Sequence, residues 1–580
     1  MKIKTSSSAK HFFYFLTLMS ALFILPFLIN GCNPFEKKPV KAKNGMVVSA
    51  SEIASKVGVQ ILKKGGNAVD AAVATGFTLA VTYPQAGNIG GGGFMVIHLV
   101  KGKNTTIDFR EKAPLKAFRD MYLDSAGNFL PELSQAGVTS TGVPGSVAGM
   151  IYALSKYGTM KLKDVMQPAI NLAKNGWELD EKTAKSFEYY LSIFKKYPSS
   201  YKTFTNKGRP YEEGDIFKQP MLAETLELIK EKGSAGFYKG KVAKLLIKQI
   251  KSLGGYISQN DLDKYKPVER KPIVGSYRNY KIVSMPPPSS GGIALVEMLN
   301  ILENYSFNQN DWGTSGYIHK LVETMKYTYA DRTEYLGDDD FYPVPIKALT
   351  SKKYAKSIFY KIGDKATPSE KIKAGKIKNF KESTETTHYS VYDKVGNAVS
   401  VTTTLNSSFG SRIVVEGAGF LLNNEMDDFS SKPGEPNIYG LLGSEANSIQ
   451  PEKRMLSSMT PTIVLKEGKP FLILGSPGGS QIITTVLQVI LNVIDFNMNI
   501  KQAVDAPRFH HQWLPDKIVY EKDALNENVK KELIKLGYHL SDNNGKSRRI
   551  GMVAAIMIDN KNKIIYGAFD KRGPGKAVGY

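Results

Sequence analysis

The sequence predicts an α+β fold in which paired strands pack against helices. The last third of the chain contains three pairs of β-rich runs, each joined by a short polar turn: 387–393 with 398–404, 461–466 with 470–475, and 552–558 with 563–569. Helical patterns dominate roughly 145–260, and another helix is expected at 481–495. Strand pairs with helices around them favour an α+β sandwich.

Two helices are predicted at the start of the ordered chain. Ser49 and Glu52 have the spacing of a capping box, apolar residues recur at helical intervals over 53–61, and a Gly-Gly pair follows at 65–66. Residues 67–79 then predict a second helix that is largely buried. Ordered structure is therefore expected from about residue 45.

The first 31 residues have the pattern of a secretory signal. Three lysines within the first ten residues precede an apolar run over 12–29. The run ends in "LINGC", which resembles the cleavage and lipidation box of bacterial lipoproteins, although Asn30 fits it imperfectly. Cys32 is the only cysteine of the chain. We expect cleavage before Cys32 and its lipidation, the alternative being an uncleaved membrane anchor with an incidental cysteine.

Export to the periplasm follows from this prediction, with residues 32–44 as a lysine-rich tether that attaches the protein to a membrane through lipid on Cys32. A single cysteine leaves no internal disulfide, so the exported chain depends on its core. The net charge of +23 comes from dispersed lysines. Without an arginine-rich stripe beside stacking aromatics, this charge does not predict nucleic-acid binding.

The stretch "KNFKESTETTHYSVYD", residues 378–393, marks a boundary. A Lys- and Ser-rich segment from about 350 to Glu385 predicts an exposed loop, and a strand begins after Thr386. A threonine hydroxyl is a poor nucleophile, but a free α-amine on the same residue can act as its base. Two threonines before a strand usually reflect β-propensity alone. The alternative is that the chain is cut at Glu385–Thr386 and that Thr386 becomes an N-terminal nucleophile.

Downstream motifs carry polar residues that could serve such a site. The predicted strand 398–404, which pairs with the strand 387–393, leads into "VTTTLN". Later motifs are "LLNNEMDDFS", "RMLSSMTPTIV" and "LGSPGGSQIITT". The acids of "LLNNEMDDFS" could also cap a helix or face solvent. The glycines before the predicted helix could form an oxyanion hole or cradle a phosphate. The candidate residues are Thr404, Asn406, Glu425, Asp428, Ser457, Ser458, Gly478 and Gly479.

With these motifs in place, the chain resembles the γ-glutamyltransferases (γ-glutamyltranspeptidases), members of the N-terminal-nucleophile hydrolase superfamily. The resemblance runs from about residue 44 to 580, with few marks over 155–275. It is carried by "GGNAVDAAVA", "PQAGNIGGGGFM", "DFREKAP", "GVPGSVAGM", "SMPPPSSGGIALVEMLNILENY", "YADRTEYLGD", "TTHYSVYD", "LLNNEMDDFS", "LSSMTPTIV", "GSPGGSQIITT" and "DAPRFHHQWLPD". It implies a four-layer αββα sandwich in which a large subunit, 45–385, and a small catalytic subunit, 386–580, share one core.

The resemblance also implies a role for each candidate. Thr386 is the nucleophile, Glu385–Thr386 is the self-cleaved bond, and Thr404 hydrogen-bonds the nucleophile. The substrate α-carboxylate is held by Arg110, Ser457 and Ser458. The α-amino group is held by Asn406, Glu425 and Asp428. Gly478 and Gly479 form the oxyanion hole, and the loop 435–454 is a lid whose gating aromatic is Tyr439.

The chemistry of a γ-glutamyl donor agrees with this assignment. Its amino-acid head has one carboxylate and one ammonium, so its site needs a cation beside acids. Arginine offers a two-pronged fork to the carboxylate, and two carboxylates with an amide oxygen suit the three donors of an ammonium. No cofactor and no metal are expected, because the acidic cluster at 331–340 and the pair His510-His511 lack a metal-site pattern.

The function expected is therefore that of a γ-glutamyltransferase and glutathione hydrolase. It transfers the γ-glutamyl group of glutathione to water or to amino-acid and peptide acceptors through an ester on Thr386. One alternative is a β-lactam (glutaryl or cephalosporin) acylase of the same fold. It is disfavoured by Arg110 with Glu425 and Asp428, because a glutaryl group has no α-amine. Another is an unprocessed lipoprotein that only binds γ-glutamyl peptides.

Overall fold

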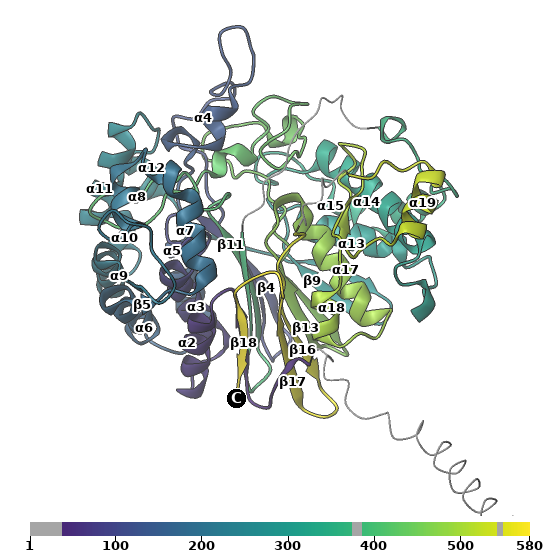
Figure 1. The fold of residues 1–580 in the computed structure, drawn as a ribbon, viewed down its shortest axis with the longest axis horizontal. Coiled ribbons are helices and arrows are strands. Elements are labelled where there is room, and N and C mark those ends of the chain that lie inside the picture. The colour runs from purple at the N-terminus through teal and green to yellow at the C-terminus, as the bar shows by residue number, and fades with distance from the viewer. Residues whose placement is uncertain (1–37, 374–385, 542–548) are drawn as a thin grey trace, which may run out of the picture. The chain divides into compact units, whose positions relative to one another are not determined.

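The computed structural model describes residues 38–373, 386–541 and 549–580. Two antiparallel sheets of seven strands each lie between two groups of helices, so that residues 39–580 form four layers, αββα (Figure 1). This confirms the four-layer prediction. Every helix within the described ranges is too short or too polar to cross a bilayer. The predicted signal, Cys32 and Glu385 lie outside the described residues.

One sheet combines strands from both ends of the chain. Its order is β18 (Lys576–Gly579), β2 (Met46–Ser49), β10 (Thr387–Tyr392), β11 (Ala398–Thr404), β3 (Gly92–His98), β4 (Asn104–Asp108) and β7 (Val268–Arg270). The predicted pair 387–393 with 398–404 is confirmed as β10 and β11, at the centre of this sheet. On either side of this pair, strands from before residue 385 continue the sheet.

The second sheet contains the other two predicted strand pairs. Its order is β1 (Val40–Ala42), β17 (Ile564–Phe569), β16 (Ala554–Asp559), β13 (Lys469–Gly475), β12 (Thr462–Lys466), β9 (Tyr280–Ser284) and β8 (Ile273–Tyr277). The two sheets pack face to face through β10, β11, β13 and β16. Polar side chains occur in this interface: Ser400 Oγ donates to Leu474 O at 3.0 Å and Ser390 Oγ donates to Ala554 O at 3.1 Å.

Helices of the N-terminal half lie on the first sheet. The inner ones are α2 (Glu52–Lys63), α3 (Ala68–Thr82) and α5 (Ser146–Tyr157), which contact β2, β10, β11 and β4. Further helices of this half are α4 (Pro131–Gln135), α6 (Leu162–Asn175), α7 (Glu181–Phe194), α8 (Pro198–Thr203), α9 (Pro220–Lys232), α10 (Ala235–Tyr238), α11 (Gly240–Ser252) and α12 (Gln259–Lys264). The predicted helical region 145–260 is thus confirmed.

Helices of the second group cover the other sheet. α13 (Gly291–Leu302), α17 (Ile482–Ile494) and α18 (Ile500–Asp505) contact its strands. The other members of the group are α14 (Ser315–Tyr335), α15 (Ile346–Leu349), α16 (Lys352–Phe359) and α19 (Glu527–Leu536). The helix expected at 481–495 is confirmed as α17, which is buried nearly throughout because it lies between β13 and α13.

Three local predictions were wrong. Ordered structure begins before residue 45, because β1 lies within the predicted tether 32–44 and pairs with β17. The N-cap of α2 is Ser51, not Ser49: Ser51 accepts from Ala54 N, whereas Ser49 ends β2 and its hydroxyl contacts Ser55 Oγ at 2.8 Å. The segment from 350 is not loop throughout, because α16 spans 352–359 and buries Ala355 and Ile358 against α13. Two apolar residues three positions apart are enough to place one short helical face on the core.

The glycine run "GNIGGGGF" is explained by close backbone packing. A Cβ at Gly91 would lie 2.0 Å from Thr404 O, and one at Gly93 would lie 2.4 Å from Thr402 O. Only glycine lets the start of β3 approach β11 this closely. This approach draws the end of β11 toward the loop that precedes β3.

Candidate active site

Strand ends at one edge of the first sheet bring the predicted catalytic residues together. Thr387 pairs with Thr403, so the start of β10 lies beside the end of β11, and Thr404 pairs with Gly92 at the start of β3. β4 ends at the same edge, and Arg110 follows two residues later. Because the strands are antiparallel, residues far apart in the sequence meet here.

The second sheet contributes from the corresponding edge. β13 ends at Gly475 and leads to Gly478 and Gly479, while Ser457 and Ser458 precede β12. The imidazole of His388 on β10 packs on Gly475, where a Cβ would meet Nδ1 at 2.4 Å. The two sheets are therefore in contact beside the first residues of β10.

Thr386 lies directly before β10 and its residue is 4% exposed. Side chains alternate along a strand, so Thr386 shares the face of His388 and Ser390, which is the face toward the second sheet. Tyr389 on the opposite face packs on α3, where its hydroxyl lies 2.7 Å from the Cβ position of Gly76. Thr386 therefore faces the space between the sheets.

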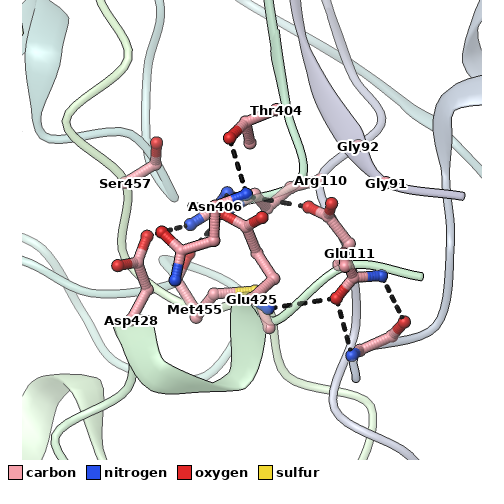
Figure 2. Close-up of polar contacts among 12 residues, drawn as sticks. Gly91, Gly92, Arg110, Glu111, Thr404, Asn406, Glu425, Asp428, Met455 and Ser457 are labelled. Carbon is pink, nitrogen blue, oxygen red and sulfur yellow. Dashed lines mark hydrogen bonds and ion pairs between the residues drawn. The ribbon is translucent and has the colours of Figure 1, made fainter. Parts of the chain in front are cut away.

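The Arg110 guanidinium lies in a cluster of carboxylates (Figure 2). Arg110 Nη1 donates to Glu425 Oε1 and Nη2 donates to Asp428 Oδ2, while Nε donates to Met455 O at 3.3 Å. Glu111 Oε2 lies 3.6 Å from Nη1. Arg110 is fully buried, and the short 3-10 helix Glu425–Asp428 holds the two acids against it.

Three acids around one cation leave this cluster with excess negative charge when all are ionised. Burial raises the pKa of Glu425 and of Asp428, although Arg110 opposes the shift. Burial also raises the pKa of Glu111. For Arg110, burial lowers the pKa, but Glu425 and Asp428 outweigh that and raise it above its ordinary value. The guanidinium stays charged and ready to pair with an anion.

Asn406 is placed by a backbone conformation that is unusual for its type. Its φ is 77°, in the left-handed region, and its N–H donates to Thr404 Oγ1 at 2.7 Å. Its side-chain Nδ2 donates to Asn424 O at 3.0 Å. This turn directs the Asn406 side chain toward Glu425 and Asp428 instead of continuing β11 (Figure 2).

Tyr439 joins the loop 435–454 to this turn. Its hydroxyl donates to Asn406 O at 2.5 Å and also contacts Asn406 Oδ1, and the residue is 3% exposed. Its ring covers Gly479, where a Cβ would lie 2.4 Å from Tyr439 Cδ1. The loop is therefore in contact with both the Asn406 turn and the glycine turn.

The glycine turn between β13 and α17 has the geometry expected of an anion site. Gly478 has φ 137° and Gly479 has φ 53°, and the 3-10 turn Gly479–Gln481 leads into α17. The first N–H groups of a helix have no acceptor within that helix, so they can donate to an anion. A carbonyl oxygen that gains charge in a transition state is such an anion.

The predicted site residues that the structure describes, with the exception of Gly478, all line one small cavity. Its volume is about 20 Å³, enough for about one water molecule, so in this conformation it is too small to hold an amino acid. The lining residues are Arg110, Arg332, Thr386, Thr404, Asn406, Glu425, Asp428, Tyr439, Leu441, Ser457, Ser458, Met459, Gly479 and Ile482.

Sequence reasoning missed one cation of this cavity. Arg332 on α14 is buried, and it donates to Ser458 Oγ at 3.2 Å and to Ser290 Oγ at 3.1 Å. Burial lowers its pKa. It lies in "YADRTEYLGD", one of the motifs that carry the family resemblance, but nothing in that motif distinguishes its side chain from the neighbouring charged ones.

The match to known proteins agrees with this geometry. Residues 54–580 match the family described as "Gamma-glutamyltranspeptidase". The chain belongs to this family. Among curated relatives, the "Glutathione hydrolase proenzyme" of Escherichia coli (strain K12) is 51% identical over 92% of this chain and 91% of the relative. That of Bacillus subtilis (strain 168) is 40% identical over 95% of this chain and 96% of the relative.

Some proteins similar to this chain are named acylases. "Acylase ACY 1 proenzyme" from Pseudomonas sp. (strain SE83) is 36% identical over 87% of this chain and 88% of the relative. The solved cephalosporin acylase of Bacillus halodurans matches with a TM-score of 0.82 and 27% identity over 95% of this chain and 98% of its own. The solved Helicobacter pylori γ-glutamyltranspeptidase is 51% identical, with a TM-score of 0.57, over 58% of this chain and 97% of its own.

Proposed function

We propose that this chain is a self-cleaving γ-glutamyltransferase and glutathione hydrolase with Thr386 as its nucleophile. The observation that carries the proposal is the ring of Arg110, Glu425, Asp428 and Asn406 in the same cavity as Thr386. This set of groups is complementary to the carboxylate and ammonium of an amino-acid head. The γ-carbonyl, at the far end of the glutamyl side chain, then lies toward Thr386.

Donor binding is an exchange of ion pairs. Without a donor, Arg110 pairs with Glu425 and Asp428. A bound donor places its carboxylate on the Arg110 fork and its ammonium between the two acids, so every buried charge keeps an opposite partner. The second carboxylate oxygen of Glu425 is buried and has no hydrogen-bond partner among the described residues. A hydrogen bond from the ammonium of the bound substrate to this oxygen would remove the free-energy cost of burying the oxygen without a partner.

Catalysis proceeds in two transfers. The α-amine of Thr386 takes the proton from Oγ as Oγ attacks the γ-carbonyl carbon, and the Gly478–Gly479 turn stabilises the oxyanion. The C–N bond of the donor breaks, and its nitrogen leaves with the proton. Water or an acceptor amine then attacks the ester carbon, the C–Oγ bond breaks, and the attacking group gives a proton to Oγ through the α-amine.

Cutting before Thr386 would leave the two chains in one core. β10 and β11 would belong to the small chain, 386–580, and they are flanked by β2 and β3 of the large chain. Separating the chains would expose the interior of both sheets. We therefore expect a stable heterodimer of the chain's own two parts.

Export and lipid attachment remain part of the proposal. The apolar segment that ends in "LINGC" supports an exported, periplasmic enzyme held to a membrane by lipid on Cys32. The ordered fold begins close behind it, since β1 starts at Val40. A tether this short would keep the enzyme near the bilayer surface.

A β-lactam acylase is the alternative, since two relatives are named acylases. A glutaryl group has a carboxylate but no ammonium, so it would leave Glu425 and Asp428 without a cationic partner other than Arg110. The deciding experiment compares hydrolysis of L-γ-glutamyl-p-nitroanilide and glutaryl-p-nitroanilide by the purified two-chain protein. We expect a preference of at least 100-fold for the γ-glutamyl compound. A preference for the glutaryl compound would establish the acylase, and a single uncut, inactive chain would favour a binding lipoprotein.

A further inference from the structure

The strand ends opposite the small cavity form a distinct surface of the molecule. Five short turns lie there: 43–45, 99–103, 393–397, 466–469 and 559–563. The first joins β1 of one sheet to β2 of the other, so the two sheets meet at this end, and the other four close antiparallel hairpins. In Figure 1 this end lies below the labels β17 and β18. We call these five turns the turn edge.

The turn edge is strongly basic. It carries eight lysines, all of them exposed: Lys43, Lys101, Lys103, Lys394, Lys466, Lys469, Lys561 and Lys563. The same five turns contain three acids, Asp393, Glu467 and Asp559. Within the described residues, Lys103 pairs with Glu269 at 3.6 Å and the other seven lysines have no ion-pair partner. Their charge therefore remains free to attract an anionic partner.

Two of the three acids serve the turns that contain them. Asp393 is buried, and its Oδ1 accepts hydrogen bonds from the N–H groups of residues 395, 396 and 397. Asp559 Oδ1 accepts from Lys561 N at 3.1 Å and from Asn562 N at 2.9 Å. These acids fix the turn conformations and leave the lysine side chains pointing into solvent.

The opposite end of the strands has no such excess. The loops 112–137 and 430–454, which follow Arg110 and contain Tyr439, carry six basic and six acidic residues. These loops touch each other, since Ala113 N donates to Lys453 O at 2.8 Å. Of the two ends of the sheets, only the turn edge is therefore charged to attract an anionic surface.

Two turns of this edge also expose apolar side chains. Val100 and Val395 are each 55% exposed. Their turns are in contact, because Val100 N donates to Asn397 Oδ1 at 2.9 Å. A single exposed valine has no special meaning. Two of them on adjoining turns, surrounded by lysines, resemble the surfaces of proteins that combine shallow apolar insertion with attraction to anionic lipids.

The start of the fold lies within reach of a bilayer if Cys32 carries lipid. β1 pairs with β17 so that it runs toward the turn edge and ends beside Lys43. The seven residues 33–39 that link Cys32 to β1 can span at most about 25 Å. The turn edge can therefore reach the headgroups without any change in the fold.

We propose that the turn edge is a docking surface for an anionic bilayer, with its lysines on lipid phosphates and with Val100 and Val395 among the headgroups. This inference goes beyond the proposed function and rests only on its placing of the chain at a membrane. β11 runs from Ala398 at the turn edge to Thr404 at the cavity, a distance of about 20 Å. Docking in this way turns the cavity away from the bilayer, toward soluble donors.

The first test measures sedimentation of the chain from residue 33 with vesicles. This chain keeps the whole compact unit 39–580 and lacks Cys32, so lipidation plays no part in the result. Vesicles of phosphatidylcholine with phosphatidylglycerol are compared with vesicles of phosphatidylcholine alone. The turn variant combines Lys101→Gln, Lys394→Gln, Lys469→Gln and Lys561→Gln.

The matched control removes the same charge from helices α8 and α11. It combines Lys202→Gln, Lys244→Gln, Lys248→Gln and Lys251→Gln, all at exposed lysines without an ion-pair partner among the described residues. Each lysine near an anionic surface strengthens binding by about fivefold. We expect the turn variant to bind the anionic vesicles at least about 20-fold more weakly than wild type, and the control to stay within about threefold.

The second test reports the orientation. Because Cys32 is the only cysteine, the chain from residue 33 has none, and one introduced cysteine can carry an environment-sensitive fluorophore. The emission from Val395→Cys should move to shorter wavelength on anionic vesicles. The emission from Ser125→Cys, an exposed position in the loop 112–137, should not change.

Each outcome decides the proposal. Equal losses in the two lysine variants would show that net charge alone attracts the chain, and would overturn the docking surface. So would a wild type that does not bind the anionic vesicles, or equal emission shifts at the two labels. A shift at Val395→Cys with soluble polyphosphate but not with vesicles would assign the edge to a soluble polyanion instead. Hydrolysis of γ-glutamyl-p-nitroanilide, measured in parallel, should match wild type in both variants. Its absence from wild type would refute the proposed function and leave the vesicle result standing.

Discussion

The hydroxyl of Tyr439 donates to the main-chain oxygen of Asn406 at 2.5 Å, so the loop 435–454 is tied to the turn that ends β11. The same ring covers Gly479. One aromatic side chain thus contacts both a residue of the proposed head site and the proposed oxyanion turn. In this conformation the small cavity holds about one water molecule. We predict that a donor enters after Tyr439 moves.

Tyr439→Phe tests this contact. The ring stays but the hydrogen bond is lost, which typically removes about 0.5–1.5 kcal/mol and so shifts the loop toward its open state by up to about tenfold. We expect faster proteolytic cutting within 435–454 and a KM for γ-glutamyl-p-nitroanilide that changes by up to tenfold. Self-cleavage should remain complete. A proteolysis rate equal to that of wild type would show that the hydroxyl does not hold the loop.

Thr386→Ala should give one uncut and inactive chain, because Thr386 Oγ must attack the Glu385 carbonyl in an N→O acyl shift. The readout is an SDS gel with N-terminal sequencing. Thr387→Val is the matched control: it alters the adjacent buried hydroxyl, which has no hydrogen-bond partner among the described residues. It should still yield two chains. Two chains from Thr386→Ala would assign the cut to another protease.

Arg110→Lys keeps the charge at the head site but removes the planar fork. Disrupting a buried charged hydrogen bond typically costs about 2–5 kcal/mol, so KM for the donor should rise by at least about 30-fold. Self-cleavage should stay normal. Arg209→Lys is a suitable control, since Arg209 forms an exposed pair with Asp215. A donor KM unchanged in Arg110→Lys would remove Arg110 from the head site.

The buried carboxyl of Asp427 should make the free energy of unfolding depend on pH. Burial raises its pKa to about 7, although Ser134 Oγ and Ile438 N donate to it. The pKa of Asp in the unfolded chain is about 3.9. Between about pH 3.9 and pH 7, Asp427 is therefore protonated in the native state but ionised in the unfolded state. Stability must fall as pH rises through this window, by up to about 1.4 kcal/mol per pH unit from this group.

Asp427→Asn should remove this contribution. Urea unfolding of the uncut Thr386→Ala chain, with and without Asp427→Asn, gives the free energy of unfolding at several values between pH 4 and 8. The difference between the two proteins should grow with pH and level off above about pH 7. A difference that is constant across this range would show that Asp427 is ionised throughout.

Cys32→Ser tests the lipid anchor. We expect the wild type to sediment with membranes even after a high-salt wash, because burial of acyl chains does not depend on ionic strength. The variant should be released or keep its signal uncut, with donor hydrolysis intact. Wild type found wholly in the soluble periplasmic fraction, with its N-terminus beyond Cys32, would refute lipidation.

Much of the fold was predictable from local patterns. β10 with β11, β12 with β13, and β16 with β17 are hairpins, in which a short turn brings neighbouring segments together. α17 is a long apolar run between turn signals. Such elements depend on residues close in sequence, so periodicity and turn chemistry suffice. The capping box failed at Ser49 because pairing in the sheet, a tertiary contact, extends β2 to that residue.

The sequence by itself determined the residue types of the site, since a nucleophile before a strand, a cation and acids are each visible as motifs. Only the tertiary structure decided that they meet: Arg110 contacts Glu425 and Asp428 across more than 300 residues. The same holds for Arg332, which reaches Ser458 from α14. Contacts of this kind arise from the order of strands in two sheets and from the packing of helices on them, which no local pattern encodes.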